Sequence, residues 1–245
     1  MNDSLGKGAI RLRRPLVIAG TASGAGKTAV AIGIMAALTR RGLKVAPFKV
    51  GPDYIDPGYH QAATGRAPRN LDTWLRDDAG MRENFLRGAA EADVSIIEGV
   101  MGLFDGRAGA GNAGSTAEAA VLLEGALVLV VDCARMSRSL AALLHGFATF
   151  DPAARLAGVI LNNTGSDRHR AMLADAAAEA GVPVLGAIPR RPELKMESRH
   201  LGLVAAAETE CGELIDNLAA AVEEGVDLER LLALAETLDY AWSDG

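Results

Sequence analysis

Aromatic residues and cysteine are scarce in this 245-residue chain: Phe, Trp and Tyr make up 4% of it, and two cysteines occur. Its core must therefore be built mainly from Ala, Val, Leu and Ile. Cys133 and Cys211 lie far apart, without a CxxC pattern or a Cys/His cluster, so the sequence indicates neither a disulfide framework nor a zinc site. Both cysteines are expected to be small, mostly buried residues.

Clustered positive charge and long apolar segments are also missing. The formal net charge of -6 argues against a general nucleic-acid-binding protein. The basic stretches RLRR (11–14) and RRPELK (190–195) are short and are expected to be solvated faces. No apolar run has the length of a membrane span, and the first residues do not read as a signal peptide, so a reducing, bacterial-type cytoplasm is the expected location.

The sequence does contain a regular alternation of short apolar runs and Ala-rich amphipathic segments. The runs predict strands with apolar residues on both faces at 15–20, 44–50, 93–99, 126–132, 156–162 and 183–189. The segments between them predict helices near 27–41, 77–91, 115–124, 138–149 and 167–180, followed by two further helices at 208–224 and 227–239. This alternation predicts an α/β fold with a mainly parallel sheet and helices on both sides.

The Gly-rich stretch GTASGAGKT (20–28) lies between a predicted strand and a predicted helix. Its three glycines allow backbone N–H groups to turn toward phosphate, Lys27 supplies positive charge, and Thr28 offers a hydroxyl to Mg²⁺. A strict P-loop has its first Gly where this chain has Thr21. We interpret the stretch as a variant P-loop, and the alternative is an ordinary Gly-rich turn with a surface lysine.

Acidic residues follow two other predicted strands, at the sheet edge where ligands bind in such folds. GPDYIDPGYH (51–60) carries Asp53 and Asp56, and its Gly and Pro residues are expected to break any helix and to form a shaped loop. SIIEGVMGLFDG (95–106) carries Glu98 at a strand end and Asp105 in a Gly-rich loop. Acids beside a phosphate site are costly without a cation, so the pattern favours Mg²⁺. Turn formation by the aspartates and a solvent-exposed Glu98 are the alternatives.

Longer segments resemble known enzymes. The loop GTASGAGKT is similar to that of dethiobiotin synthetase and its relatives. The segments KVGPDYIDPGYHQAATGRAPRNLDTW, EGVMGLFDG, STAEAAVLL, VDCARMSRS, GVILNNTGSDRHR and VLGAIPR…SRHLGLV resemble cobyrinic acid a,c-diamide synthases, including the forms specific for hydrogenobyrinic acid. The resemblance runs from about Pro15 to the end of the chain. It implies a P-loop NTPase-type three-layer sandwich like that of dethiobiotin synthetase.

The activity implied by this resemblance is amidation of the a and c acetate groups of a corrinoid in cobalamin biosynthesis. The reaction would use ATP and Mg²⁺ and pass through an acyl phosphate. By position, the resemblance places Asp53, Asp56, Glu98 and Asp105 at the active site. Lys27 of the phosphate loop completes the expected catalytic set, because it supplies positive charge to the transferred phosphate. The metal ligands we expect, directly or through water, are Thr28, Asp53 and Glu98.

The remaining candidate residues concern ATP and the corrinoid. Asn162 is similar to the adenine-reading Asn of the wider family, and the expected ATP-binding set is Thr21, Ser23, Gly24, Ala25, Gly26, Lys27, Thr28, Asn162 and Pro189. Arginine suits carboxylate binding, and the macrocycle carries several carboxylates. The candidate substrate contacts are Tyr59, His60, Arg66, Arg69, Asn70, Ser137 and Arg138.

Members of the resembled family usually continue into a glutaminase domain that releases ammonia from glutamine. Neither cysteine of this chain is flanked like the nucleophile of such a domain. We therefore expect residues 1–14 to be an N-terminal extension, 15–207 the ATP-binding synthetase domain, and 208–245 C-terminal helices with the start of a linker. Ammonia is expected to come from a glutaminase domain outside this chain, and a homodimer stays open.

Three other functions stay open. The same chemistry would serve nickel-sirohydrochlorin as substrate, or the later synthesis of cobyric acid. The third is a switch-type P-loop ATPase that binds a protein partner. Such ATPases carry an additional lysine near the start of the loop, where this chain has Ala22, so the loop favours a ligase. Neither nucleic acid nor a membrane is an expected partner.

Overall fold

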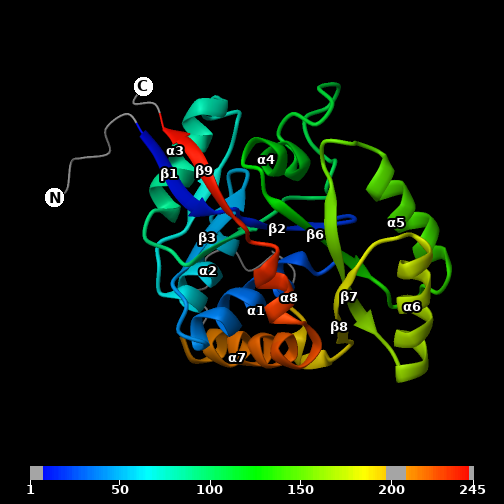
Figure 1. Cartoon of the computed structure of the whole chain (residues 1–245). Coiled ribbons are helices and arrows are strands. Elements are labelled where there is room, and N and C mark those ends of the chain that lie inside the picture. Colours follow the sequence, from blue (N-terminus) through cyan, green and yellow to red (C-terminus); the bar gives the residue numbers. More distant parts are fainter. Residues whose placement is uncertain (1–7, 197–207, 243–245) are drawn as a thin grey trace.

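The structure is a computed structural model of the chain and describes residues 8–196 and 208–242 (Figure 1). The strands are β1 (Gly8–Arg13), β2 (Leu16–Gly20), β3 (Val45–Val50), β4 (Arg69–Leu71), β5 (Val94–Glu98), β6 (Ala126–Asp132), β7 (Leu156–Thr164), β8 (Val184–Pro189) and β9 (Thr237–Trp242). The α-helices are α1 (Lys27–Arg40), α2 (Asp56–Thr64), α3 (Asp78–Ala89), α4 (Thr116–Leu122), α5 (Ser139–Thr149), α6 (Asp167–Glu179), α7 (Glu208–Gly225) and α8 (Leu228–Ala233). A 3₁₀ turn, η1, covers Pro192–Leu194.

Seven strands form one sheet in the order β4-β3-β5-β2-β6-β7-β8, and all neighbouring pairs are parallel. The six strands predicted from apolar runs are all present, as β2, β3, β5, β6, β7 and β8. Short β4 was not anticipated, because its three residues carry no apolar run. The strand carrying the Gly-rich loop, β2, lies in the interior of the sheet between β5 and β6.

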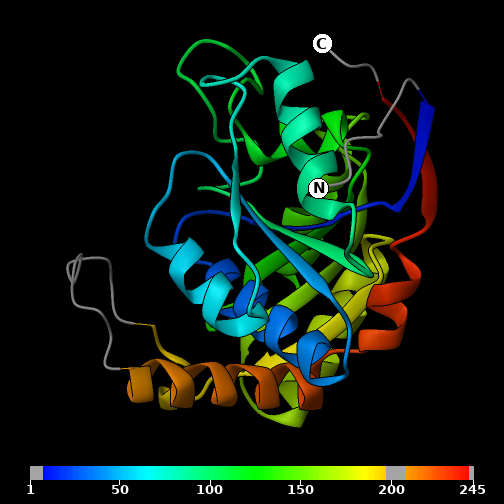
Figure 2. The same cartoon turned by 90° about the vertical axis from the view of Figure 1, so that its left-hand side faces the viewer.

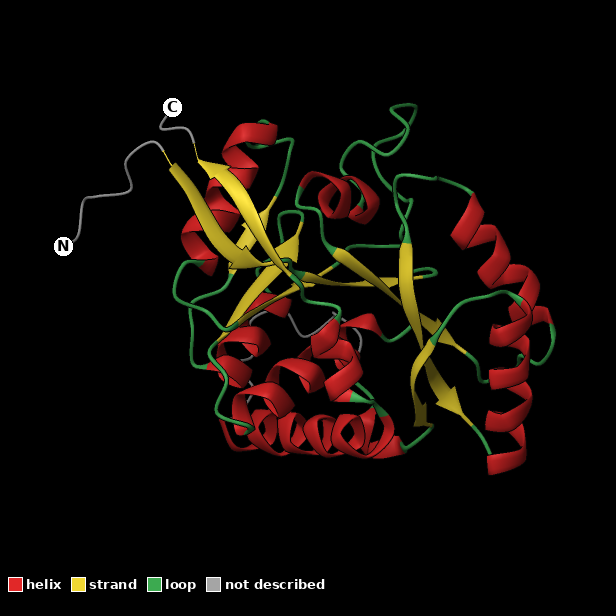
Figure 3. Cartoon of the chain, in the orientation of Figure 1, coloured by secondary structure: helices red, strands yellow, loops and turns green. Residues whose placement is uncertain are grey.

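Helices cover both faces of the sheet, as Figures 1 and 3 show. Alternate strand residues point to opposite faces, so a buried strand contributes to two cores. In β2, Val17 and Ala19 pack in the core that holds residues of α3, α4, α5 and α6. Leu16 and Ile18 pack in the core that holds residues of α1, α7 and α8. The chain therefore folds as the expected three-layer α/β sandwich.

The first and last described segments pair with each other. Strands β1 and β9 form a separate antiparallel ladder, running from Gly8 opposite Trp242 to Arg13 opposite Thr237, and Figure 2 shows them side by side. Tyr240 of β9 is buried, and its hydroxyl donates to the carbonyl of Leu123, 2.9 Å away. The segment expected to be an N-terminal extension is thus attached to the body of the protein through β9.

Two predicted elements differ from the structure. The helix predicted at 227–239 ends at Ala233, and the following residues form β9, because pairing with β1 and burial of Tyr240 outweigh local helical preference. The predicted loop at 51–60 contains the start of α2. Pro57 lies in the first turn of α2, where its missing N–H removes no helical hydrogen bond. Residues 198–204, part of the resembled motifs, and the expected boundary at 207 lie outside the described residues.

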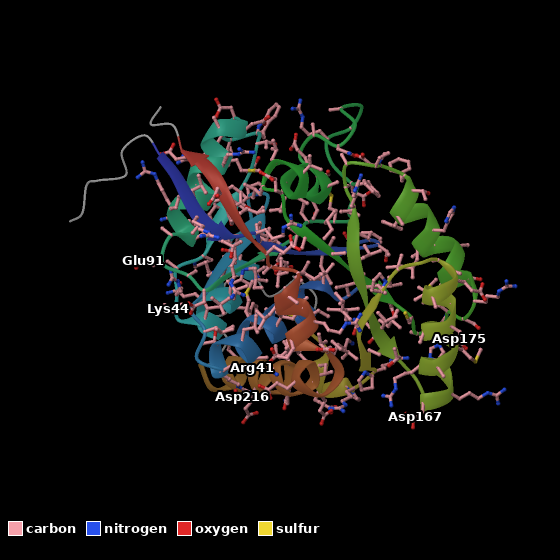
Figure 4. All side chains as sticks on the ribbon, viewed as in Figure 1. Arg41, Lys44, Glu91, Asp167, Asp175 and Asp216 are labelled. Carbon is pink, nitrogen blue, oxygen red and sulfur yellow. The ribbon has the colours of Figure 1, made fainter. Side chains whose placement is uncertain are left out.

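Many charged side chains lie on the outside of the helices, whereas Lys27 of α1 and Asp56 of α2 are buried. Figure 4 labels Arg41 and Asp216 on the side formed by α1 and α7, and Asp167 and Asp175 on α6. In the part of the chain that the structure describes, no helix combines the length and apolar character needed to cross a membrane.

The contact between α1 and α7 gives a prediction about stability. A Cβ added at Gly33 in α1 would lie 2.7 Å from the carbonyl oxygen of Leu218 in α7, so the two helices would have to move apart. We expect Gly33→Ala to lower the free energy of unfolding by about 1–3 kcal/mol. At Gly146 in α5 the added Cβ would meet nothing within 4 Å.

The matched control is therefore Gly146→Ala, which we expect to raise the free energy of unfolding by about 0.5–1 kcal/mol, because alanine is the better helix former. Urea titrations followed by circular dichroism measure both variants. Equal effects of the same sign would contradict the close packing of α1 against α7.

Candidate active site

The Gly-rich loop connects β2 to α1 at the carboxyl edge of the sheet. Gly24 and Gly26 have φ angles of +83° and +92°, a region that residues with a side chain rarely adopt. A Cβ at Gly26 would lie 2.0 Å from Nδ2 of Asn162, the side chain that donates to the carbonyl of Ala25 at 3.1 Å. The end of β7 thus packs directly on the loop and fixes its shape.

A cavity of about 1020 Å³ opens beside this loop. The predicted ATP-binding residues that line it are Ser23, Gly24, Gly26, Lys27, Thr28, Asn162 and Pro189. Two others in that set do not line it: Ala25 is buried, and the backbone N–H of Thr21 donates to Val130 of β6. The cavity also has a wall formed by α7, which the sequence analysis did not assign to the site.

The stretch RRPELK is largely exposed, as expected, but it also borders the cavity. Arg190 and Arg191 line the cavity, and the guanidinium of Arg191 also contacts Glu224 of α7. Both arginines directly follow β8, and residues that follow a parallel strand lie at the ligand-binding edge of the sheet. Their position after an apolar run was therefore a usable signal in the sequence.

Lys49 lies at the centre of the charged residues next to the cavity. It is wholly buried, and its Nζ lies 2.8 Å from Glu98 Oε1, 2.7 Å from Asp56 Oδ2 and 4.0 Å from Asp53 Oδ2. Nζ also donates to the carbonyl of Gly99 at 3.1 Å. In the sequence, Lys49 is one residue of an apolar strand and carries no signal of its own. The positive charge expected beside these acids is therefore supplied, in part, by the chain itself.

The register of the sheet explains this contact. Strands β3 and β5 are parallel neighbours, and Lys49 is the direct partner of Glu98 across them. Side chains opposite each other on adjacent strands point to the same face of the sheet. Two residues 49 positions apart in the chain therefore form a buried ion pair.

Glu98 is wholly buried, so its reading as a solvent-exposed acid is wrong. Thr28 Oγ1 of the P-loop donates to Glu98 Oε1, and His60 Nε2 lies 2.7 Å from Oε2. His60, a candidate substrate contact, is wholly buried and lies against Glu98. Its position indicates a role in holding Glu98.

The protonation states follow from these contacts. Burial by itself raises the pKa of Glu98, but the hydrogen bond from His60 and the charge of Lys49 outweigh it and lower this pKa to about 2. Burial lowers the pKa of Lys49, and the charges of Glu98 and Asp56 more than reverse the effect. Both partners of the ion pair are thus charged at neutral pH. Burial and the charge of Glu98 raise the pKa of Asp56, despite its contact with Lys49.

Asp53 combines the two roles that the sequence left open. Its Oδ1 accepts hydrogen bonds from the backbone N–H groups of Ile55 and Asp56, which is turn chemistry. Its Oδ2 faces Lys49. Burial raises the pKa of Asp53, but the hydrogen bond from Ile55 and the charge of Lys49 lower it overall. Asp105 is exposed and accepts from the N–H of Gly102 at 2.9 Å, so it closes a turn in the loop after β5.

The candidate substrate residues do not gather in one place. Asn70 donates to the carbonyl of Asp53 at 2.8 Å and supports the acidic loop. Arg66 and Arg69 turn toward the segment of α3, where they contact the carbonyl of Glu91 and the side chain of Asn84. The three remaining candidates lie elsewhere. Tyr59 on α2 and Ser137 before α5 are half-buried, and Arg138 pairs with Glu179 of α6 at 3.0 Å.

The oxygen atoms near the P-loop fit a magnesium ion held mainly by a nucleotide. Within residues 8–196 and 208–242, no three His, Cys, Asp or Glu side chains form a cluster that could hold a metal by themselves. Mg²⁺ commonly takes one or two carboxylates and completes its shell with phosphate oxygens and water. The adjacent oxygens of Thr28 and Glu98, with Asp53 on the neighbouring loop, are donors of this kind.

A P-loop at the carboxyl edge of a parallel sheet, with Lys27 and Thr28 lining a cavity beside buried acids, defines a nucleotide-binding domain of the P-loop class. Residues 16–204 match the family described as the CobQ/CobB/MinD/ParA nucleotide binding domain, and the chain belongs to this family.

Curated relatives share about half of the residues of this chain. A hydrogenobyrinate a,c-diamide synthase of Streptomyces coelicolor is 53% identical over 236 residues, which cover 94% of this chain and 49% of the relative. A cobyrinate a,c-diamide synthase of Picrophilus torridus is 45% identical over 94% of this chain and 52% of its own length. The chain thus spans about half the length of the curated relatives it matches.

Solved structures confirm the fold alone. A nucleotide-binding protein in complex with ADP from Archaeoglobus fulgidus matches with a TM-score of 0.51 and 14% identity, over 88% of this chain and 90% of that one. Chloroplast FtsY from Physcomitrella patens matches with a TM-score of 0.50 and 16% identity, over 89% of this chain and 69% of that one.

The lowered pKa of Glu98 predicts how stability depends on pH. A carboxyl group whose pKa falls from 4.5 to about 2 on folding stabilises the folded state above pH 4.5 and loses this contribution as the pH falls toward 2. The contribution is on the order of 3 kcal/mol. We expect Glu98→Gln to flatten the fall in unfolding free energy between about pH 5 and about pH 3, measured by urea titration.

The control for this measurement is Glu91→Gln, which removes an exposed glutamate that is not part of the ion pair. Its pH dependence should match that of the wild type. If Glu98→Gln also keeps the wild-type slope, Glu98 does not bind Lys49 and His60 as the structure describes.

Proposed function

We propose that this chain is the ATP-dependent synthetase part of an a,c-diamide synthase, which amidates the a and c acetate carboxylates of a corrinoid. The observation that carries the proposal is the charged group of Lys49, Asp56 and Glu98 directly beside the P-loop cavity. The names of relatives about 50% identical to the chain support the substrate class, with hydrogenobyrinate or cobyrinate as the corrinoid.

The chemistry requires a phosphorylated intermediate, because oxide is a poor leaving group from a carboxylate. A carboxylate oxygen of the substrate attacks the γ-phosphorus of ATP, the bond to the bridging oxygen breaks, and ADP leaves. The nitrogen of ammonia then attacks the acyl carbon, inorganic phosphate leaves, and one proton passes to solvent. The products are the amide, ADP and phosphate.

The residues at the P-loop suit the first of these steps. The transition state for phosphoryl transfer carries its charge on the γ-phosphate oxygens, so fixed positive groups lower the barrier. Lys27 and the backbone N–H groups at the start of α1 provide such groups in the cavity. His60 and Lys49 together keep Glu98 ionised, and the charge of Lys49 reduces the repulsion between that acid and the incoming anions.

For the metal, we propose that Thr28, Asp53 and Glu98 bind Mg²⁺ directly or through water. A bound Mg²⁺ would neutralise phosphate charge during transfer. Asp56 lines the cavity and touches Lys49, so we assign it to orienting the substrate carboxylate or ammonia, together with Asp105 on the adjacent loop. Asn162 and Pro189 line the same cavity and are proposed to contact adenine.

The nitrogen source is proposed to lie outside this chain. A glutaminase needs a reactive thiolate. Burial, aided by Asp132, raises the pKa of Cys133 to about 12, and burial also raises the pKa of Cys211, so neither thiol ionises readily at neutral pH. The relatives are about twice as long as the matched region, which leaves room for a glutaminase domain.

The metal assignment predicts the response of Asp53 to substitution. In Asp53→Asn the amide oxygen can still accept from Ile55, so the turn is kept while the negative charge is lost. We expect this variant to need a severalfold higher Mg²⁺ concentration for half-maximal ATP turnover. The matched control is Asp151→Asn, which alters a turn-forming aspartate elsewhere. An unchanged magnesium titration for Asp53→Asn would remove Asp53 from the metal site.

The proposed function predicts amide formation from ammonium but not from glutamine. Purified chain with ATP, Mg²⁺ and either hydrogenobyrinate or cobyrinate is supplied with each nitrogen source, and the product is identified by mass. Activity with ammonium should rise with pH toward the pKa of ammonia, because NH₃ is the nucleophile, and high concentrations are needed without delivery from a second domain. Lys27→Ala should fold normally and form no product.

Two results would contradict this proposal. Product formed from glutamine by the chain alone would place the glutaminase activity within it. Release of ADP that depends on a protein partner, with no amide formed from either corrinoid, would favour the switch ATPase instead.

A further inference from the structure

A second cavity lies next to the acidic loops. It has a volume of about 400 Å³, within the range of small-molecule sites. Its walls come from the segments that follow β3, β4 and β5, and from the start of α4. Buried apolar side chains form its base: Val50, Leu71, Met81 and Ala119.

Large apolar side chains stand exposed at the rim of this cavity. Trp74 is 67% exposed and Met101 is 40% exposed, and both line it. The guanidinium carbon of Arg107 lies 4.1 Å from the centroid of the Trp74 ring, a cation–π contact that holds the two side chains together. An exposed aromatic face joined to a cation suits a ligand that is both flat and anionic.

The two acidic residues that line the cavity do not pair with Arg107, so its guanidinium is available to bind an anionic ligand. Of the cavity's three charged residues, Asp72 accepts from the N–H groups of Trp74 and Leu75, and Glu118 accepts from Thr73 Oγ1 and the N–H of Gly114. Both acids are thus used to shape their own loops. The structure records no carboxylate on the guanidinium of Arg107 among the described residues.

Some residues that line the second cavity are close in sequence to the proposed catalytic residues. Gly51 and Pro52 line it and directly precede Asp53, while Val100 and Met101 line it and follow Glu98 by two and three residues. A ligand that extends from the acids along these two loops would therefore meet this cavity.

We propose that this cavity binds the edge of the corrinoid, with an apolar part of the ring against Trp74 and a peripheral carboxylate on Arg107. The inference rests on the proposed function. The occupant is a broad polycarboxylate with an apolar ring, which matches a cavity with an apolar base and one cation at its rim. Arginine binds a carboxylate strongly, because two parallel hydrogen bonds can join the two groups. Trp74 and Arg107 thereby set where the acetate to be amidated lies.

The test compares steady-state constants for the two substrates. We expect Arg107→Ala to raise the KM for hydrogenobyrinate or cobyrinate about tenfold, about 1.4 kcal/mol, with the KM for ATP unchanged. Arg107→Glu should raise it further by repulsion, and Arg107→Lys should restore part of the affinity. Trp74→Ala should raise the corrinoid KM, whereas Trp74→Phe should keep most of it. Ammonium is the nitrogen source throughout.

A matched control removes a different exposed arginine, Arg155→Ala, from the loop before β7. It should leave both KM values unchanged. Binding of the corrinoid to the wild type should also weaken as salt rises, and less so for Arg107→Ala, because the lost contact is electrostatic.

The outcomes separate this inference from the proposed function. A wild-type chain that neither binds nor amidates a corrinoid would contradict the function itself. A wild type that is active, with wild-type corrinoid KM in Arg107→Ala and Trp74→Ala, would overturn the inference alone. An equal rise in the KM for ATP would show a general loss of structure, and would also overturn it.

Discussion

The buried ion pair between Lys49 and Glu98 is the interaction on which the site depends. The two charges come from adjacent strands and meet because the register of β3 and β5 places them opposite each other. Removing one partner of such a pair leaves an uncompensated buried charge, at a cost of about 3–5 kcal/mol. The charges persist because each has several partners: Asp56 and the carbonyl of Gly99 for Lys49, and two hydrogen-bonding side chains for Glu98.

Glu98 connects this pair to the nucleotide site. Its two carboxylate oxygens contact different segments, the P-loop through Thr28 and α2 through His60. A shift of β5 relative to β2 would therefore disturb the phosphate loop and the acidic loop together. This arrangement also explains why Asp53 can serve two purposes, since one oxygen holds the turn and the other faces the charged group.

The loops at the carboxyl edge of the sheet line two cavities of different chemical character. The larger one, beside the P-loop and α7, has Lys27, Arg190 and Arg191 among its lining residues, so its charge is suited to phosphates. The smaller one has an apolar base and a single arginine beside an exposed tryptophan. The acids lie on loops that border both cavities. In the proposed reaction, the carboxylate of the substrate and the nucleotide would meet at these loops.

Local patterns in the sequence predict the elements that depend on adjacent residues. Apolar runs defined six of the seven strands in the sheet, and the spacing of Gly, Lys27 and Thr28 defined the phosphate loop, because strand burial and loop shape leave a pattern in adjacent residues. The acids were found at strand ends for the same reason. Contacts between distant segments become visible only in the folded protein. In the sequence, Lys49 is one more residue of an apolar strand, and the register of β3 and β5 places it against Glu98. His60 is a candidate substrate contact in the sequence, and α2 buries it. Residues 237–242 form β9 because β1 lies beside them. These contacts join residues far apart in the chain, and no local pattern encodes them.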